Sequence, residues 1–269
     1  MTRDVVIRQA GSDDYAIYAS LFPELGTGDP VPSREWWLLE FAARTLVAER
    51  DGVAVAFLRW QLLNGVGYVR QVVTAAAARR QGIGRALMNA TAALFRAQGI
   101  GSWCLNVNPR NIPALGLYTS RGLAFAYEAV SVRFPWAQVG TFPRVDVQVR
   151  EIEPADDGFL EATFDLVPGQ LQDGRDNGRV LRCAHRPEDS AAGVAIFNTG
   201  FPGAYPFKVS EPGVVRPLLE ALQPAADPSY DYMQLVIEDD TATAEMLLGI
   251  GALERLRFHH LRGPVPAAE

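Results

Sequence analysis

The alternation of apolar and polar positions predicts a mixed α/β structure for the first half of the chain. Residues 5–10 alternate with a period of two, as in a half-buried strand. Residues 12–22 and 33–44 instead place apolar side chains at helical spacing. Ser12 and Ser33 stand at the starts of these two segments and are predicted to cap the helices.

Residues 45–74 predict a three-stranded antiparallel meander. Three β-rich runs are separated by Asp51-Gly52 and Asn64-Gly65, and such pairs between strands are strong hairpin signals. The pattern then predicts a helix closed by Gly99, a strand, a short helix and a final strand. These four elements are expected at 83–98, 103–108, 113–122 and 125–134.

The second half repeats this order of elements. Residues 135–144 form a connector, and the strand at 145–152 is followed, as at 5–10, by a helix that starts at acidic residues. A second meander, a helix, a strand, a helix and a last strand follow, at 179–186, 193–200, 204–210, 212–224, 231–238, 241–251 and 252–261. The repetition predicts a duplication, with one domain over 1–138 and another over 144–269. Each domain is expected to be α/β, with a mostly antiparallel mixed sheet flanked by helices.

Composition excludes several classes of protein. The chain has 269 residues, of which 48% are hydrophobic and 21% charged, which is ordinary for a globular protein and excludes a fibre or a disordered chain. No run approaches the ~18 uncharged apolar residues of a membrane helix, and the charged N-terminus predicts no signal peptide. Two cysteines, Cys104 and Cys183, are too few for a disulfide framework, and no CxxC pair indicates zinc. A cytoplasmic protein without a metal or a membrane association is expected.

The charge is distributed unevenly. The net charge is −6, yet residues 1–140 carry 14 arginines and 10 acidic residues, whereas residues 141–269 carry 11 basic and 21 acidic residues. An acidic whole argues against nucleic-acid binding. The positive first half suits a small phosphorylated ligand, and the acidic second half is interpreted as a solvated surface.

The segment 79–87, RRQGIGRAL, carries the clearest chemical signal. It follows a predicted strand and begins a predicted helix, and Gly82 and Gly84 allow a ligand to approach the backbone closely. The first N–H groups of a helix favour an anion, and three arginines add charge, at positions 79, 80 and 85. A P-loop lysine is missing, and Leu87 stands where a dinucleotide-binding loop has its third glycine. The segment therefore predicts a phosphate cradle of another kind.

A second motif lies downstream, where Asn111 and Tyr118 are separated by about two helical turns and share a face. Together the motifs Arg79-x-x-Gly82-x-Gly84 and Asn111-x-x-Ala114-x-x-x-Tyr118 resemble those of the GNAT superfamily of N-acetyltransferases. The resemblance covers most of residues 3–136. The duplicated plan is similar to that of tandem GNAT proteins, of which mycothiol synthase is an example.

The resemblance implies acetyl-CoA as cosubstrate and a role for each motif residue. The strand before the loop would separate from its neighbour at a bulge and receive the pantetheine arm. Backbone N–H groups of the loop would hold the pyrophosphate, Asn111 would bind the pantetheine, and Tyr118 would protonate the departing thiolate. The implied coenzyme-binding residues are Val72, Val73, Thr74, Arg79, Arg80, Gln81, Gly82, Ile83, Gly84, Arg85, Asn111 and Tyr118.

The sequence departs from the family pattern in two places. Many members carry a glutamate on the strand before the loop as general base, but residues 68–74 contain no acid. Glu35, Glu40 or Glu128 acting through water, the C-terminal residue, or solvent could replace it. The second half has no glycine pair after its meander and no tyrosine in the helix at 241–251, so it is predicted to bind no coenzyme and to form one wall of the acceptor cleft.

The predicted function is acetyl-CoA-dependent transfer of an acyl group, by direct attack, to the primary amine of a small molecule. Two alternatives remain open: an acyl-CoA-binding sensor or scaffold without turnover, and an N-acetyltransferase for proteins or peptides. The chain is expected to act as a monomer, with its two domains as a pseudo-dimer, or as a homodimer. His259 and His260 point to opposite faces of a strand and are not expected to chelate a metal. Trp36 and Trp37 are expected to be core or an aromatic wall.

Overall fold

The computed structural model describes residues 5–63, 65–188 and 190–267, and the chain forms two compact units. Unit 1 comprises Met1–Ala126 and His260–Glu269, and unit 2 comprises Tyr127–His259. Asn64, of the predicted Asn64-Gly65 turn, lies outside the described residues.

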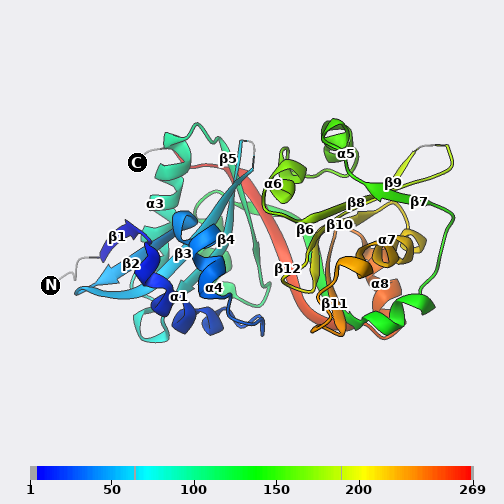
Figure 1. Cartoon of the computed structure of the whole chain (residues 1–269). Coiled ribbons are helices and arrows are strands. Elements are labelled where there is room, and N and C mark those ends of the chain that lie inside the picture. Colours follow the sequence, from blue (N-terminus) through cyan, green and yellow to red (C-terminus); the bar gives the residue numbers. More distant parts are fainter. Residues whose placement is uncertain (1–4, 64, 189, 268–269) are drawn as a thin grey trace. The chain divides into compact units, whose positions relative to one another are not determined.

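The described part of unit 1 contains five strands that lie wholly within it, helices with α or π geometry, and short 3-10 turns. Its strands are β1 Val5–Gln9, β2 Thr45–Arg50, β3 Val53–Leu63, β4 Val66–Thr74 and β5 Ser102–Val107. Its helices are α1 Tyr15–Leu21, α2 Arg34–Trp36 with the π-helical Trp37–Phe41, α3 Ile83–Ala97 and α4 Ile112–Thr119. These strands follow one another in the sheet in sequence order, and β4 and β5 are parallel while β1 to β4 are antiparallel (Figure 1).

Two apolar layers cover the two faces of this sheet. Helix α3 packs on one face with its buried stripe, which includes Leu87 and Phe95, against Leu58 and Val69 of the strands. On the other face, α1 and the segment after α2 bury an aromatic group built from Tyr18, Phe22, Trp37 and Phe57. The alternation of the strands supplies one row of side chains to each layer.

The final strand of each repeat is not confined to its own unit. Strand β6, Ala124–Pro135, pairs with β11 within unit 2, and β12, Leu253–Pro264, begins in unit 2 and ends in unit 1 next to β5. The expected domain boundaries at 138 and 144 therefore differ from the observed division. The reason is that each of these long strands makes its contacts in both halves of the chain, which a linear boundary cannot represent.

Unit 2 contains the second copy of the plan. Its sheet runs in the order β12, β6, β11, β10, β9, β8, β7. The strands not yet given are β7 Gln148–Glu151, β8 Val180–His185, β9 Ala191–Asn198, β10 Gly203–Val209 and β11 Tyr232–Glu238. The helices are α5 Asp157–Thr163, α6 Gln170–Asp176, α7 Val215–Leu222 and α8 Thr241–Gly249.

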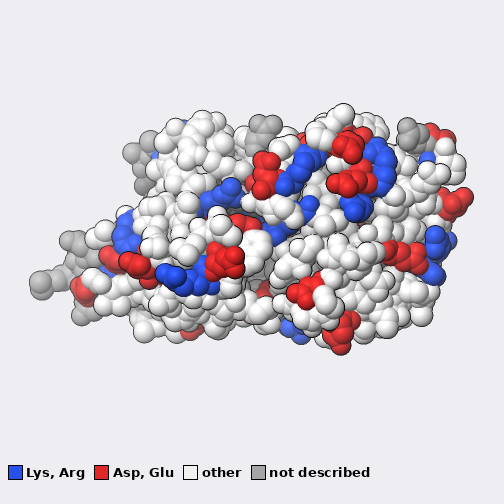
Figure 2. All heavy atoms as spheres, viewed as in Figure 1, with Lys and Arg blue, Asp and Glu red and all other residues white. Residues whose placement is uncertain are grey.

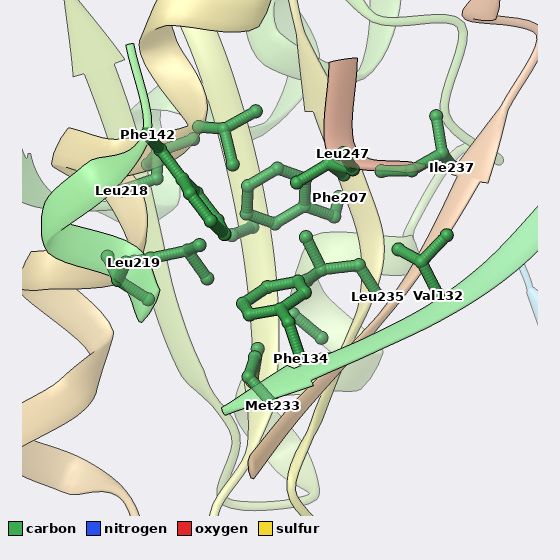
Figure 3. Close-up of a cluster of buried hydrophobic side chains, with 14 of the residues drawn as sticks. Val132, Phe134, Phe142, Phe207, Leu218, Leu219, Met233, Leu235, Ile237 and Leu247 are labelled. Atoms are coloured by element: carbon green, nitrogen blue, oxygen red, sulfur yellow. The ribbon is translucent and has the colours of Figure 1, made fainter. Parts of the chain in front are cut away.

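The core of unit 2 is apolar and rich in phenylalanine. Figure 3 shows Phe134 and Phe142 packed beside Phe207 and Leu235, with leucines of α7 and α8 closing the cluster. The rings of Phe134 and Phe142 meet edge to face at 5.1 Å. Phe142 comes from the predicted connector, whose Trp136–Thr141 segment forms a 3-10 turn that buries Trp136 as well.

The duplication extends to a matching ion pair. Arg8 and Asp14 are six residues apart in unit 1, and Arg150 and Asp156 are six apart in unit 2, each pair forming two hydrogen bonds of 2.7–2.9 Å. In both cases the aspartate also accepts a backbone N–H at the start of the following helical turn. Asp14, not the predicted Ser12, therefore closes the first helical turn, because a carboxylate tied to an arginine is already oriented toward it.

The predicted helix at 33–44 is interrupted. Ser33 caps it as expected, accepting the N–H of Trp36 at 3.2 Å, but the π-helical turn at Trp37–Phe41 and a 3-10 turn at Ala42–Arg44 follow. Trp37 is buried and donates Nε1–H to the carbonyl of Gly11 at 3.1 Å, so it belongs to the core. Among the described helices, none is long and apolar enough to cross a membrane.

Candidate functional site

Strand β4 contains a bulge in the middle of the unit 1 sheet. Arg59 of β3 pairs with Gln71, but the next residue, Trp60, pairs with Val69, so that Arg70 has no counterpart on β3. An extra residue of this kind bends a strand and redirects its side chains. The bulge expected on the strand before the glycine loop is therefore present.

The parallel pairing of β4 with β5 ends beside the bulge. The register covers Val66–Val69 opposite Ser102–Leu105 and stops there, whereas β4 remains paired with β3 up to Thr74. One edge of β4 is therefore released from Arg70 onward. The backbone of Val72, Val73 and Thr74 lies along that edge, where an extended ligand could take the place of a neighbouring strand.

The bulge also places two consecutive polar side chains on one face. Val69 and Val72 both pack in the layer under α3, whereas Val73 packs on the opposite face with Tyr18 and Trp37. Arg70 and Gln71 therefore share the α1 face, which regular alternation would forbid.

The glycine loop joins this strand to the 15-residue helix α3. Arg80 and Gly82 both adopt left-handed conformations, with φ of 63° and 80°. A Cβ placed on Gly82 would meet no atom within 4 Å, so the loop is open in front of the helix. Gly84 lies in the first turn, where a Cβ would come within 3.2 Å of Leu117. The loop thus has the shape and the helix N-terminus that a phosphate requires.

The three arginines of the loop are held differently. Arg79 donates Nε–H to the carbonyl of Thr74 at 3.0 Å and forms an ion pair with Glu24, so it secures the loop to β4 and to the 3-10 turn that follows α1. Gln81 is likewise engaged, by Arg50 and by the carbonyl of Ala77. Arg80 and Arg85 are solvent-facing, and their charges remain available to a ligand.

Asn111 and Tyr118 occupy the start and the end of α4, as their spacing predicts. The side chain of Asn111 caps the helix by accepting the N–H of Ala114 at 3.2 Å. Tyr118 packs in the layer under α3, and burial raises the pKa of its hydroxyl to about 12. The phenol is therefore protonated throughout the neutral range. Ile83, the remaining loop residue of the motif, is buried in the same layer.

A polar group lies on the opposite, α1 face, and sequence reasoning missed it. Arg59 donates Nε–H to Oε1 of Gln71 at 3.2 Å, and its guanidinium lies 4.3 Å from the centre of the Phe41 ring. Arg70 covers the ring of Tyr68 at 4.4 Å. The broken alternation at Val69-Arg70-Gln71-Val72 was the available signal. The resemblance implies a bulge on this strand, but the residue at which it falls depends on the pairing with β3.

The end of β12 brings a histidine to the same face. His260 is 2% exposed, its Nδ1 lies 2.7 Å from Oδ1 of Asn106, and its ring meets the edge of Tyr68. His259, with 31% of its side chain exposed, is on the other face, in agreement with the prediction that the two rings diverge. Within the described residues, no group of three or more His, Cys, Asp or Glu side chains could hold a metal ion.

The candidate bases from the sequence lie in different places. Glu35 is exposed on α2, and Glu40 is partly buried in the π-helical turn, close enough to Arg59 to affect its pKa. Glu128 belongs to unit 2 and forms an ion pair there with Arg257. Glu40 is thus the candidate that shares a face with the bulge.

Unit 2 retains the strand geometry without the loop. Strand β10 also has an extra residue between Ala204 and Phe207, and its parallel pairing with β11 covers Gly203 and Ala204 only. Beyond that point a buried ion pair of 3.1 Å joins Lys208 of β10 to Glu238 of β11. The hydroxyls of Tyr127 and Tyr205 donate to the same carboxylate at 3.1 and 2.9 Å. Polar side chains thus bridge these two strands of unit 2 beyond the end of their pairing.

Comparison with known proteins agrees with this geometry. Residues 15–123 match the family model of the acetyltransferase (GNAT) family. The matched segment contains the bulged strand, the glycine loop, Asn111 and Tyr118. No curated protein matches the chain significantly by sequence.

Solved structures of acetyltransferases share the fold of the whole chain. A putative acetyltransferase from Pyrococcus horikoshii aligns with a TM-score of 0.71 at 18% identity, over 97% of this chain and 89% of that one. A GCN5-related N-acetyltransferase from Sphaerobacter thermophilus gives 0.66 at 14% identity, over 98% and 97%. A tandem GNAT protein from the clavulanic acid biosynthesis pathway gives 0.64 at 17% identity, over 99% and 100%.

The family match concerns the first half of the chain, and the likeness of fold extends over the whole of it. Residues 15–123 of the first half match the acetyltransferase (GNAT) family, and the chain as a whole shares the fold of solved acetyltransferase structures, one of them a tandem GNAT protein. The tandem plan is the one that the repetition in the sequence predicts.

Proposed function

We propose that the protein transfers an acetyl group from acetyl-CoA to a primary amine of a small molecule, with unit 1 as the active domain. One observation supports this most strongly. A single strand, β4, combines a bulge, an edge released from its neighbour and an exposed glycine loop at the start of a long helix. These three features together suit an extended ligand that ends in phosphates.

The residues present fit coenzyme A. The released backbone of Val72, Val73 and Thr74 would bind the pantetheine arm, and Asn111 would contribute its side-chain amide, since its oxygen already caps α4. The N–H groups between Arg80 and Arg85 would hold the pyrophosphate, and the open space beside Gly82 leaves room for it. Arg79 would act indirectly, by holding the loop against Thr74.

The thioester of the bound coenzyme supplies an acyl group that is already activated toward an amine. The protein then has to orient the amine, stabilise the oxyanion and return a proton to sulfur. Backbone donors on the released edge of β4 would polarise the carbonyl, and Tyr118 would give its proton to the departing thiolate. Holding both reactants on one strand edge supplies much of the remaining acceleration.

A base must also take a proton from the ammonium form of the acceptor. Strand β4 has no acidic side chain, so the proton would pass to Glu40 or to solvent. Glu40 is favoured over Glu35 and Glu128, because it is partly buried on the face of the bulge while Glu128 is already paired with Arg257.

Unit 2 would not bind a coenzyme. Lys208 and Glu238 fill the place beside its bulge, and Glu211 follows its meander where unit 1 has its loop. Its contribution would be structural. We expect a monomer or a homodimer that acts in the cytoplasm, without nucleic acid, membrane or metal.

Two other functions are weaker candidates. The absence of an acid on β4 favours an acyl-CoA-binding protein without turnover. Such a protein, however, would not need the protonated hydroxyl of Tyr118 as a proton donor. A peptide or protein acceptor would use the same chemistry. Turnover with a panel of small amines would distinguish the proposed enzyme from a binding protein. Comparing these amines with basic peptides would distinguish a small-molecule acceptor from a peptide acceptor.

Thermal unfolding with and without acetyl-CoA tests the coenzyme site directly. A ligand at 100 times its dissociation constant stabilises the native state by ~2.7 kcal/mol, which raises the midpoint by several degrees in a chain of this size. We expect this shift in the wild type and its loss in Gly82→Glu. The glutamate adds bulk and a negative charge that repels the phosphates, and it places a side chain at a left-handed position with φ of 80°. Gly178→Glu, at a left-handed glycine of unit 2 with φ of 66°, controls for backbone strain. Absence of a shift at millimolar acetyl-CoA would reject the proposal.

A further inference from the structure

The guanidinium of Arg59 is held in a fixed orientation beside the bulge of β4. Its Nε–H is used by Gln71, and one of its faces lies 4.3 Å from the centre of the Phe41 ring. The bulge is what brings Gln71 to this face, so the arrangement depends on the same feature that opens the edge of β4. A guanidinium has five N–H donors; the remaining four belong to the two terminal nitrogens, and one N–H from each of these can bind a carboxylate end-on.

The charge of Arg59 has no carboxylate partner among the residues that the structure describes. Its surroundings make this costly, because burial lowers the pKa of Arg59 to about 10, and the like charge of Arg70 is the next largest cause. Glu40 acts in the opposite direction but more weakly than Arg70. At neutral pH the guanidinium is still charged, so an enclosed cation lies next to the bulge.

A purely structural side chain at this position would not need that charge. An apolar residue of similar length would pack on Phe41 at no electrostatic cost, whereas an enclosed cation without a counter-ion is destabilising. The hydroxyl of Tyr18 is also close, since Arg59 and Gln71 both lower its pKa against the larger effect of burial. Tyr18 is 1% exposed and lies in the aromatic layer of this face.

We propose that Arg59, supported by Arg70, binds a carboxylate of the acceptor, so that the acceptor is a small molecule with both an amine and a carboxylate, as in amino acids. The inference rests on the proposed function of unit 1. The Nε–H of Arg59 is bonded to Gln71, so its two terminal nitrogens remain to bind a planar carboxylate through two parallel hydrogen bonds. Gln71 and Phe41 are positioning residues that hold the fork in place.

The location suits this class of acceptor. Gln71, the partner of Arg59, directly precedes Val72 to Thr74, whose backbone forms the released edge of β4. Arg59 lies one strand away from that edge, a spacing of ~4.8 Å across a sheet. A molecule with its carboxylate on Arg59 therefore directs its amine toward the edge at which the acyl group would be held.

The test uses matched sets of acceptors with the full-length wild-type protein. Free amino acids, their amides and their decarboxylated amines are each offered with acetyl-CoA, and release of the CoA thiol is measured. Phosphoethanolamine and taurine are included as amines with other anionic groups. We expect turnover to be confined to the carboxylate set, with kcat/KM at least ~10-fold above the matched amide, as the loss of a charged hydrogen bond implies.

Substitution of Arg59 then separates binding from chemistry. Arg59→Met should raise the KM of the preferred amino acid by roughly 10- to 100-fold and change kcat much less, because the carboxylate is bound equally in the ground and transition states. Arg59→Lys should retain part of the affinity, since it keeps the charge but not the fork. Arg144→Met, at an exposed arginine of unit 2, should match the wild type.

Stabilisation by acetyl-CoA is recorded for each protein without any acceptor. Suppose that acetyl-CoA still stabilises the proteins. The carboxylate proposal is then overturned, and the coenzyme site stands, if amides, decarboxylated amines, phosphoethanolamine or taurine are acetylated as well as the amino acids. The same holds if no member of the panel is acetylated. If acetyl-CoA stabilises none of the proteins, the proposed function fails and this inference fails with it. Should Arg59→Met not fold, Arg59→Lys and the wild-type panel decide.

Discussion

Lys208 and Glu238 form a buried ion pair of 3.1 Å at the point where β10 and β11 stop pairing in unit 2. The side chains are 16% and 5% exposed, and two tyrosine hydroxyls complete the shell of the carboxylate. In unit 1 the corresponding strands, β4 and β5, have no such bridge between the described residues that follow their pairing. The same strand geometry is therefore bridged by an ion pair in unit 2 but not, among the described residues, in unit 1.

This relationship predicts a large effect of Glu238→Gln on stability. The amide keeps two tyrosine contacts but leaves the charge of Lys208 enclosed without its counter-ion, so we expect a loss of about 2–4 kcal/mol in the free energy of unfolding, measured in urea. Glu220→Gln is the control, because Glu220 pairs with Arg144 and Arg216 at the surface and should lose less than ~1 kcal/mol. Equal losses in the two variants would contradict the assignment of a buried pair.

The role of Tyr118 predicts a separation of turnover from binding. Tyr118→Phe removes only the hydroxyl, so kcat should fall roughly 100-fold, at the lower end for loss of a general acid, while the dissociation constant of acetyl-CoA stays within about two-fold. Steady-state kinetics and calorimetric titration measure the two quantities. Tyr230→Phe in unit 2 serves as the matched control. Unchanged turnover in Tyr118→Phe would remove this residue from the chemistry.

The pKa of Tyr118 predicts the alkaline side of the pH profile. Burial raises this pKa to about 12, so the proton donor is retained as pH rises, and only above that value is it lost. The rate with an amine acceptor should therefore increase with pH as the amine deprotonates and then stay level to about pH 10. A decline centred near pH 9 in the wild type that is absent from Tyr118→Phe would show that the hydroxyl titrates earlier than its burial implies.

Close packing under α3 predicts that Gly67 cannot be replaced. A Cβ at Gly67 of β4 would lie 2.3 Å from the ring of Phe95, which is fully buried between Trp60 and Trp103. Gly67→Ala should destabilise the protein by about 1–3 kcal/mol, as overpacking of a core does. Gly101→Ala is the control, because a Cβ there would meet nothing within 4 Å. Thermal unfolding compares the two, and similar midpoints would contradict the packing described.

The repeated arginine–aspartate pair predicts a loss of stability in acid. Hydrogen bonds from Arg150 lower the pKa of Asp156 to about 2, and Arg8 lowers that of Asp14. A lowered pKa means that the stabilisation is complete above the unfolded value near 4 and is lost as pH falls toward 2. Because these side chains are partly exposed, Asp156→Asn should cost only ~0.5–1 kcal/mol at pH 7. Its free energy of unfolding should converge with that of the wild type as pH falls through about 2, and a constant difference would contradict the linkage.

Much of the fold was predictable because it is encoded locally. Periodicity and turn residues predict the meander at 45–74, the helix closed by Gly99 and the order of elements in the second half. In the first hairpin, Asp51 and Gly52 adopt the left-handed conformations that a tight turn requires. Helix α6 was missed, since QLQDGRD is short, polar and interrupted by a glycine.

The sequence by itself determined the motifs of the site and the duplication, because glycine spacing, helix spacing and element order are properties of neighbouring residues. Tertiary structure decided which strand completes which unit, because the pairing of β6 and β12 depends on contacts with distant strands. It also decided that Arg59, Arg70 and Gln71 share a face, because a bulge arises only when two strands pair with unequal numbers of residues. The residues for which we infer a role in choosing the acceptor were therefore hidden in the sequence, whereas those that match the family motif were not.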